Sequence, residues 1–315
     1  MNEFVYSVGT LPRDCLDYLN DNDVEVVLGT GHLDMETFKS IGEKISVLIF
    51  PDIVFPMELL KYLPNLRLIA RCGVGIDKLP LDELTKRRIH VTNTEGVNAD
   101  SVAELTIGLM LALSHKIVSA NTESHKGVRK LYARHLTGSE LKGKTVGLIG
   151  YGHISRKVEN LLRVFGTDIL VANRSQKKIK YGCQVPFNTL ICNADIISLH
   201  IPLVKATEDL IDETVLKQMH SETLLINTSR GGLINEQDLF KCLKKGEIGG
   251  AALDTLRNEP IGVDHPLLKL PNVIVTPHIG AQTRDTIERT GMMVAKEIVN
   301  FIETATLLHP VNQFN

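Results

Sequence analysis

The chain has 315 residues, of which 43% are hydrophobic and 23% are charged, and its formal net charge is −2. This length allows two domains with cores of their own, and the composition is that of an ordinary soluble globular protein. The near-neutral charge gives no indication of nucleic acid or an anionic membrane as a partner. No apolar stretch reaches membrane-spanning length, the N-terminus lacks the features of a signal peptide, and the five cysteines have no paired spacing. These features predict a cytoplasmic location with reduced thiols.

The first 98 residues alternate short apolar runs with helix-like segments. We expect strands at 4–8, 24–28, 47–50, 66–70 and 89–92, and helices at 11–20, 34–41, 56–63 and 81–87. Such alternation predicts a parallel sheet with helices on both faces. This part has no glycine fingerprint, so we expect a doubly wound domain without a dinucleotide site of its own.

A long apolar segment follows this first part of the chain. Ser101 and Glu104 have the spacing of a capping box, which predicts a helix that begins at Ser101 and continues to Ser114. Because this helix is apolar nearly all round, we expect it to be buried between layers or between subunits.

The segment 145–175 has the order strand, glycine turn, helix, strand, which is one βαβ unit. Gly150 permits a tight turn, and Gly152 lets the backbone approach a pyrophosphate at the positive end of the next helix. The third position of the fingerprint is Ser155, a residue small enough for close packing of helix on strand. Since the flanking strands and the helix are all present, the segment predicts a dinucleotide-binding unit.

The end of the second strand of this unit predicts the cofactor. The position that usually carries an acidic residue for the ribose 2′-hydroxyl is Asn173, followed by Arg174 and Ser175, with Lys177 and Lys178 close behind. A carboxylate would repel a 2′-phosphate, whereas a guanidinium and a hydroxyl can bind one. We therefore favour NADP(H), with NAD(H) as the alternative if these charges belong only to a solvated loop.

The remainder of the chain continues the alternation. We expect strands at 196–200, 223–227, 249–253 and 273–276 and helices at 211–219 and 235–245, which completes a sheet of six parallel strands. A last helix at 284–303 has Ile287, Gly291, Val294, Ile298 and Phe301 on one face, and we expect it to return to the first domain. The predicted domains are therefore 1–98 with 284–315, a discontinuous substrate domain, and 99–283, a dinucleotide-binding domain, with the substrate in a cleft between them.

Four loops follow the carboxyl ends of predicted strands, where open α/β sheets bind ligands. They are the segments 71–77, 227–232, 253–260 and 276–280. In the first of them, Gly73 and Gly75 expose backbone N–H groups that suit a carboxylate.

These motifs, in this order, resemble those of the D-isomer-specific 2-hydroxyacid dehydrogenases over almost the whole chain. They are Arg-x-Gly-Val-Gly-x-Asp at 71–77, Asn-x-x-Ser-Val-Ala-Glu at 98–104, Gly-x-Gly at 150–152, His-x-Pro-Leu at 200–203, Asn-Thr-x-Arg-Gly at 227–231, Asn-Glu-Pro at 258–260 and Pro-His-Ile-Gly at 277–280. The resemblance implies two Rossmann-like domains and a catalytic arginine, glutamate and histidine, which match Arg230, Glu259 and His278.

The chemistry of these residue types agrees with that assignment. Reduction of a 2-keto acid places a hydride on C2 and a proton on the carbonyl oxygen. His278 can supply the proton, and Glu259 beside it would favour the imidazolium, so we expect a raised pKa for the histidine. Arg230 can hold the substrate carboxylate in a fork and polarise the carbonyl group.

Further site residues are predicted around these three. The substrate-binding set is Arg71, Val74, Gly75 and Asn98. By resemblance, Asp254 orients the nicotinamide carboxamide. The cofactor-binding set is Gly150, Gly152, His153, Ile154, Asn173, Arg174, Ser175, His200, Pro202, Thr207, Thr228, Asp254 and Gly280. No cluster has metal-ligand spacing, so we expect no metal.

The leading hypothesis is a reductase of small 2-keto acids such as glyoxylate and hydroxypyruvate, acting as a homodimer. D-3-phosphoglycerate dehydrogenase is the alternative within the class. A hypothesis of another class is an NAD(P)H-sensing protein similar to the corepressors that resemble this family. Such a sensor would bind the dinucleotide without turnover, so an activity assay separates the two classes.

Overall fold

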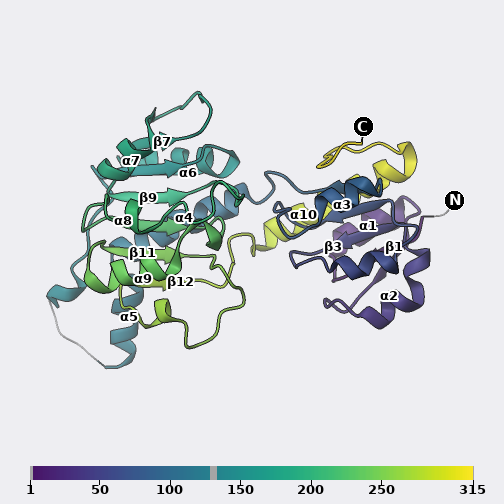
Figure 1. Cartoon of the computed structure of the whole chain (residues 1–315), viewed down its shortest axis with the longest axis horizontal. Helices are drawn as coiled ribbons and strands as arrows, with labels where there is room; N and C mark the ends of the chain where they lie inside the picture. Colours follow the sequence, from purple (N-terminus) through teal and green to yellow (C-terminus); the bar gives the residue numbers. More distant parts are fainter. Residues whose placement is uncertain (1–2, 128–132, 315) are drawn as a thin grey trace. The chain divides into compact units, whose positions relative to one another are not determined.

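The computed structural model describes residues 3–127 and 133–314, and the chain divides into two compact units. Unit 1 comprises residues 1–98 and 282–315, and unit 2 comprises residues 99–281. Each unit contains one parallel β-sheet with helices packed against it (Figure 1). The expectation of two doubly wound α/β domains, one of them discontinuous in sequence, is confirmed.

Unit 1 is built on a five-stranded parallel sheet with the order β2-β1-β3-β4-β5. The five expected strands are all present, as β1 Val5–Ser7, β2 Val26–Leu28, β3 Val47–Phe50, β4 Leu68–Arg71 and β5 His90–Thr92. Its helices are α1 Arg13–Asp21, α2 Met35–Ile41, α3 Leu81–Lys86 and α10 Arg284–Thr304. β3 and β4 are buried at every position, as central strands with helices on both faces should be.

The last helix completes one face of unit 1. α10 packs against α1, and Gly291 lies so close to Pro12 that a Cβ would stand 2.9 Å from the proline ring. Val294, Ile298 and Phe301 are buried, as expected, but Ile287 is 47% exposed, so the expected apolar face does not extend to the first turns.

The C-terminal segment covers the β5 edge of the unit 1 sheet. The side chain of Asn312 accepts a hydrogen bond from the backbone N–H of Val91 (2.9 Å) and donates to the carbonyl oxygen of Ile89 (2.9 Å). Glu297, buried on α10, accepts hydrogen bonds from the backbone N–H groups of Leu308 (2.8 Å) and His309 (3.1 Å). The edge strand is therefore paired instead of being left open.

Unit 2 is built on a seven-stranded parallel sheet with the order β12-β11-β10-β9-β6-β7-β8. Its strands are β6 Thr145–Ile149, β7 Asp168–Ala172, β8 Cys183–Gln184, β9 Ile196–Leu199, β10 Leu224–Asn227, β11 Gly250–Leu253 and β12 Val273–Val275. Its helices are α4 Ala99–Ser114, α5 Ile117–His125, α6 His153–Val164, α7 Phe187–Asn193, α8 Glu213–Leu216 and α9 Glu236–Lys245. The strand order reverses between β6 and β9, which makes their carboxyl ends the topological switch point.

Several expected elements differ from those in the structure. Unit 2 has a seventh strand, β8, which is too short to show a hydrophobic pattern, and the helices α5 and α7 were not expected. α8 occupies only part of the expected 211–219. In unit 1, the expected helix at 56–63 is a 3-10 helix, Met57–Lys61, because Pro56 and Pro64 leave room for little more than one turn.

The expected capping box at Ser101 is wrong. α4 begins at Ala99, so Ser101 lies inside the first turn, where it is buried and its hydroxyl donates a hydrogen bond to the carbonyl oxygen of Gly280 (2.6 Å). α4 packs against α6 and against β10, β11 and β12 of its own unit, so its apolar sides are buried between layers. Among the described residues, no single helix is long and apolar enough to cross a membrane; α4 and α5 qualify only as a pair, with a 63° bend between them.

Candidate active site

The glycine turn between β6 and α6 forms an open cradle. Gly150 has a φ of +94°, and a side chain there would collide with the carbonyl group of His200. Gly152 is the N-cap of α6, and because it has no side chain it cannot cap the first N–H groups of the helix. No atom lies within 4 Å of the position that a Cβ would occupy there. Ser155 is buried, and its hydroxyl donates to the carbonyl oxygen of Gly150 (2.7 Å). The uncapped helix N-terminus therefore has the donors and the space that a pyrophosphate requires.

A cluster of cations follows the end of β7. Arg174 and Lys178 are exposed and Lys177 is half-buried, and within the described parts of the chain none of the three has a carboxylate partner. Asn173 accepts a hydrogen bond from the N–H of Tyr151 (3.1 Å) and donates to the carbonyl oxygen of Ser175 (2.8 Å). The cluster therefore carries positive charge beside the glycine cradle, with no acidic residue at position 173.

The loop after β10 carries Arg230. Asn227, fully buried at the end of the strand, donates from its side chain to the carbonyl oxygen of Arg230 (2.8 Å) and accepts from the N–H of Ser229 (3.0 Å). The guanidinium of Arg230 donates to the carbonyl oxygen of Ser229 (2.9 Å). The turn is thus fixed from within, which orients the arginine at the carboxyl edge of the sheet.

Glu259 and His278 form a hydrogen-bonded pair. Glu259 Oε2 lies 2.8 Å from His278 Nδ1, and Glu259 Oε1 accepts a hydrogen bond from the N–H of Leu256 (3.0 Å). The two side chains are 29% and 30% exposed, so the pair is reachable yet partly shielded from water. With Nδ1 held by the carboxylate, Nε2 is the ring atom suited to exchange a proton with a ligand.

Asp254 holds the segment that carries His278. Its carboxylate is buried and accepts hydrogen bonds from the hydroxyl of Thr276 (2.6 Å) and from the N–H groups of Ile279 (2.8 Å) and Gly280 (2.9 Å). His278 has a left-handed backbone with a φ of +54°, which these bonds stabilise. These hydrogen bonds fix the segment that carries His278, and the expected contact of Asp254 with the cofactor stays a prediction.

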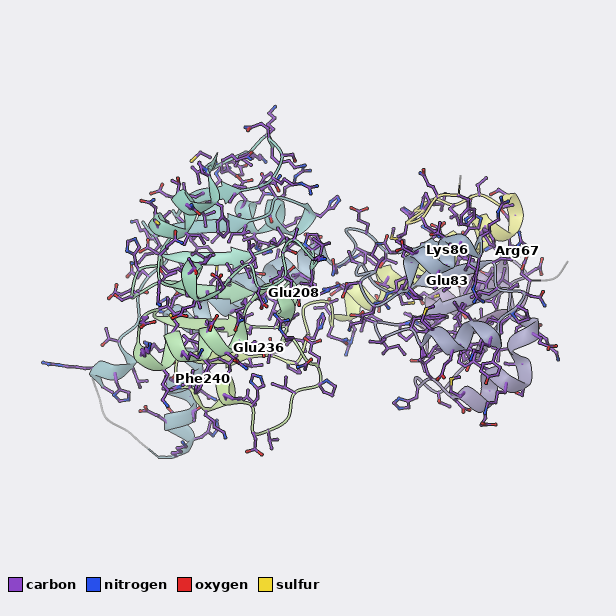
Figure 2. The ribbon with its side chains drawn as sticks, viewed as in Figure 1. Arg67, Glu83, Lys86, Glu208, Glu236 and Phe240 are labelled. Atoms are coloured by element: carbon purple, nitrogen blue, oxygen red, sulfur yellow. The ribbon has the colours of Figure 1, made fainter. Side chains whose placement is uncertain are left out.

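A second network, missed in the sequence, fixes the loop that carries Glu259. The side chain of Arg257 bonds to Glu208 (3.0 Å) and Asp209, while its N–H donates to the carboxylate of Glu236 (2.6 Å). Figure 2 labels two of these partners, Glu208 and Glu236, in unit 2. Because the partners come from separate segments of the chain, no local pattern identifies them.

The polar groups of other expected cofactor residues form hydrogen bonds with residues of unit 2 itself. The hydroxyl of Thr228 is 2.9 Å from that of Thr106, and Thr207 donates to the carbonyl oxygen of Pro202 (2.8 Å). His200 Nε2 lies 2.9 Å from the hydroxyl of Ser198, and burial lowers the pKa of His200 to about 4, which keeps the ring neutral. These side chains shape the loops around the cradle. His153 and Ile154, exposed and half-buried, open α6 directly after it.

In unit 1, the three carbonyl groups of the loop 73–75 after β4 all accept hydrogen bonds. The carbonyl oxygens of Gly73, Val74 and Gly75 accept hydrogen bonds from Thr94 N (3.2 Å), Asn93 Nδ2 (2.8 Å) and Arg71 Nε (3.0 Å), respectively. The N–H of Gly73 donates to the carbonyl oxygen of Arg71 (3.0 Å), so the N–H groups of Val74 and Gly75 are the two that this loop offers to an anion.

The side chain of Arg71 is fully buried and bonds to Asp52 as well as to the loop at Gly75. The contact with the substrate that the sequence suggested stays a prediction. Asn98 is half-buried at the end of the first segment of unit 1.

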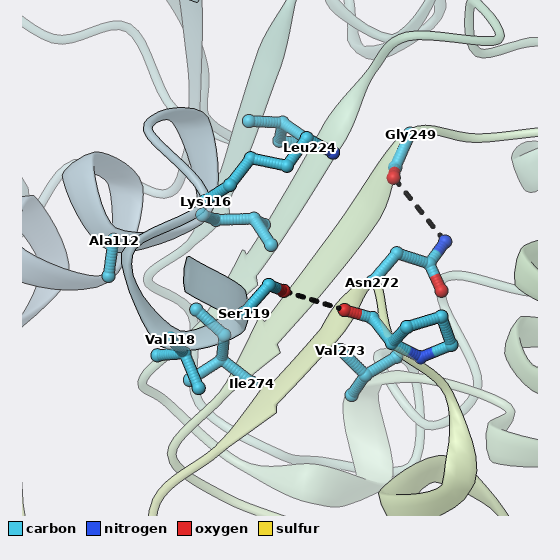
Figure 3. A pocket seen from close by; sticks show the side chains of 11 residues that line it. Ala112, Lys116, Val118, Ser119, Leu224, Gly249, Asn272, Val273 and Ile274 are labelled. Carbon is cyan, nitrogen blue, oxygen red and sulfur yellow. Dashed lines mark hydrogen bonds between the residues drawn. The ribbon is translucent and has the colours of Figure 1, made fainter. Parts of the chain in front are cut away.

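A small cavity in unit 2 lies at the amino edge of its sheet, whereas the loops that carry Arg230, Glu259 and His278 lie at the carboxyl edge. Figure 3 shows it at the amino ends of β10, β11 and β12, beside Lys116 and Ser119. Ser119 donates to the carbonyl oxygen of Pro271 (3.3 Å) and Asn272 to that of Gly249 (3.3 Å). Its volume is about 30 Å³, which is enough space for water.

Comparison with known proteins gives one family. The model of the NAD binding domain of D-isomer specific 2-hydroxyacid dehydrogenases matches residues 107–280. A glyoxylate reductase from Thermococcus litoralis is 40% identical over 253 residues, which are 78% of this chain and 76% of that protein. An archaeal relative, the D-3-phosphoglycerate dehydrogenase of Archaeoglobus fulgidus, is 33% identical over 96% of this chain, which spans only 58% of that protein.

Among solved structures, similarity extends over the whole chain. An NADPH-dependent glyoxylate/hydroxypyruvate reductase from Sinorhizobium meliloti, solved with NADP and malonate, superposes with a TM-score of 0.87. It is 26% identical and the match covers 99% of this chain and 97% of that one.

Proposed function

Because this chain belongs to the D-isomer specific 2-hydroxyacid dehydrogenases, we propose that it reduces small 2-keto acids, of the glyoxylate and hydroxypyruvate type, to D-2-hydroxy acids with NADPH. The observation that carries this proposal is the pair of Glu259 and His278, 2.8 Å apart at the carboxyl edge of the sheet that also presents Arg230.

In the proposed reaction the carbonyl of the 2-keto acid gains a hydride at C2 and a proton at oxygen. The reduced nicotinamide supplies the hydride when it is bound. His278 donates the proton from Nε2, and the Glu259 carboxylate at Nδ1 stabilises the imidazolium before that transfer. Arg230 binds the substrate carboxylate and polarises the carbonyl group, a task for which its planar fork is suited. The oxidation of a 2-hydroxy acid follows the same steps in reverse.

We assign the remaining substrate contacts to unit 1 as part of the same proposal. The N–H groups of Val74 and Gly75 bind the carboxylate, supported by the three hydrogen bonds that hold the carbonyl side of the loop. Arg71 and Asn98 remain expected contacts. Unit 1 is accordingly the substrate domain, and unit 2 is the dinucleotide-binding domain.

The preference for NADP(H) over NAD(H) is supported by the residues after β7. Arg174, Lys177 and Lys178 supply positive charge where a 2′-phosphate would lie, and Asn173 adds no negative charge. We expect further contacts with the cofactor from His200, Pro202, Thr207 and Thr228, in the loops after β9 and β10. An Asn173→Asp variant should therefore shift the ratio of kcat/KM values from NADPH towards NADH by about tenfold or more. An unchanged ratio would contradict the proposed preference.

The location and assembly of the protein are also proposals. Five free cysteines support a reducing, cytoplasmic environment. A homodimer is supported by Ile117 and Val118, which are 52% and 44% exposed on α5. Light scattering at several protein concentrations tests the dimer.

Two alternatives make different predictions in one experiment. NADPH and NADH oxidation is measured with glyoxylate, hydroxypyruvate, pyruvate, phenylpyruvate and 3-phosphohydroxypyruvate. A best kcat/KM with glyoxylate or hydroxypyruvate supports the proposal, and a best value with 3-phosphohydroxypyruvate would favour a D-3-phosphoglycerate dehydrogenase. Saturable NADPH binding without turnover of any acid would favour the sensor.

A further inference from the structure

The loop between β7 and β8, residues 173–182, is fixed by a side chain that lies outside it. Gln184, on β8, donates from Nε2 to the carbonyl oxygens of Asn173 (3.0 Å) and Ser175 (3.1 Å). Its Oε1 accepts a hydrogen bond from the N–H of Lys177 (2.8 Å). A single amide thus ties three backbone groups of the cation-bearing part of the loop.

The short strand β8 explains how this side chain reaches the loop. β8 has only two residues and pairs in parallel with β7, with Gln184 opposite Val171. Asn173 lies two residues beyond Val171, so the register places the glutamine beside the point where the loop leaves the sheet. Neither residue of β8 is buried, since Cys183 is exposed and Gln184 is half-buried. The main consequence of the pairing is therefore the position of Gln184.

The returning half of the loop is held independently by Glu159 of α6. This buried carboxylate accepts hydrogen bonds from the N–H groups of Tyr181 (2.6 Å) and Gly182 (3.1 Å) and from the hydroxyl of Tyr151. Burial, with the nearby Glu159 charge, raises the pKa of Tyr151 to about 12, so its hydroxyl stays a donor. Removing Gln184 would therefore loosen residues 173–177, in which the side chain of Asn173 would keep its bonds to Tyr151 and Ser175, while the other end of the loop remains attached.

We propose that Gln184 is a positioning residue for cofactor selection, which holds residues 173–177 so that Arg174 and Lys177 present their charges to the 2′-phosphate of NADP(H). This inference rests on the proposed preference for NADP(H). A loop ordered before binding loses less conformational entropy when the phosphate arrives, so its cations contribute more to affinity. NADH has no 2′-phosphate, and its pyrophosphate is expected at the glycine cradle, which Gln184 does not contact.

The experiment compares two substitutions of the same kind at different places. Gln184→Met keeps the length and approximate volume of the side chain and removes its three hydrogen bonds. Gln176→Met is the matched control, since Gln176 is exposed in the same loop and its side chain makes no hydrogen bond within the described parts of the chain. The dissociation constants of NADPH and NADH are measured by fluorescence titration, with adenosine 2′,5′-bisphosphate and 5′-AMP as probes that isolate the 2′-phosphate.

We expect Gln184→Met to raise the dissociation constants of NADPH and the bisphosphate by about tenfold, which is the scale of one to two net hydrogen bonds. The dissociation constants of NADH and 5′-AMP should change by less than about threefold. Gln176→Met should leave all four constants near those of the wild type. NADH binding also serves as the folding control for Gln184→Met.

Two results would overturn the inference, and they are distinguishable. If the wild type prefers NADPH and Gln184→Met keeps that preference, the role of Gln184 fails and the proposed cofactor stands. If the wild type binds both dinucleotides, and both adenosine probes, equally well, the NADP(H) preference itself fails and the role of Gln184 fails with it.

Discussion

The contact between Gly231 and the peptide group that joins Leu256 to Arg257 offers a sharp test of how the catalytic loops are held. Gly231 directly follows Arg230, and a Cβ built there would lie 1.9 Å from the carbonyl carbon of Leu256. That peptide group cannot easily retreat, because the N–H of Leu256 is bound to Glu259 and the N–H of Arg257 to Glu236. Gly231→Ala therefore pushes directly on the loop that orients Glu259.

The size of the effect follows from the geometry. Ordinary contact begins at 3.4 Å, so the two loops must separate by about 1.5 Å to admit the methyl group. A misplacement of about 1 Å in a catalytic constellation can cost about 100-fold in rate, so we expect kcat/KM to fall by about 100-fold or more. Overpacking of this kind also destabilises by about 3 kcal/mol, which lowers Tm by about 6–12 °C in a domain of this size.

Gly262→Ala is the matched control, because nothing lies within 4 Å of its Cβ position and its φ is not positive. Both variants are assayed for NADPH oxidation with glyoxylate and for thermal unfolding, with activity measured well below either Tm. If Gly231→Ala retains kcat/KM and Tm close to those of Gly262→Ala, the claim that this contact fixes the catalytic loops is refuted.

Three further predictions concern other parts of the two units. Glu259→Gln should lower kcat/KM by about 10–100-fold, since a charge-assisted hydrogen bond contributes about 1.5–3 kcal/mol, and a steady-state assay showing a change below twofold would contradict the role given to the pair. Because burial lowers the pKa of His200 from 6.5 to about 4, the unfolded chain takes up the proton first as the pH falls. The free energy of unfolding should therefore drop between pH 6.5 and 4 by up to about 3 kcal/mol, and urea titrations should show a smaller drop in His200→Gln. Asn312→Ala should destabilise unit 1 by about 2 kcal/mol, because it leaves the buried N–H of Val91 without its partner; an unchanged urea midpoint would show that the C-terminal segment does not stabilise β5.

The elements that the sequence predicted well have strong local patterns. β6, the turn at Gly150 and Gly152, and α6 follow one another within a short stretch, so hydrophobic runs and glycine spacing suffice to locate them. β8 was missed because two residues, Cys183 and Gln184, carry no periodicity. The start of α4 was misplaced because Ser101 forms its hydrogen bond with Gly280, which is distant in sequence.

The same distinction applies to the candidate site. The pairing of Glu259 with His278 was predicted because both lie in motifs after strands that become neighbours in the sheet. The hydrogen bonds that the buried side chains of Arg71 and Asp254 make were not predicted, since a motif fixes the residue type and not the direction of its side chain. Networks such as Arg257 with Glu208 and Glu236 join segments that only the folded chain brings together.

The most direct test of the central claim is the rate of NADPH oxidation with glyoxylate or hydroxypyruvate by the wild type and by His278→Gln, measured together with the dissociation constant of NADPH. We predict turnover by the wild type, a loss of about 100- to 10,000-fold in kcat for the variant, and unchanged NADPH binding, because His278 acts on the substrate as proton donor. A variant that turns over either acid as fast as the wild type would contradict the assignment of His278 as the catalytic acid.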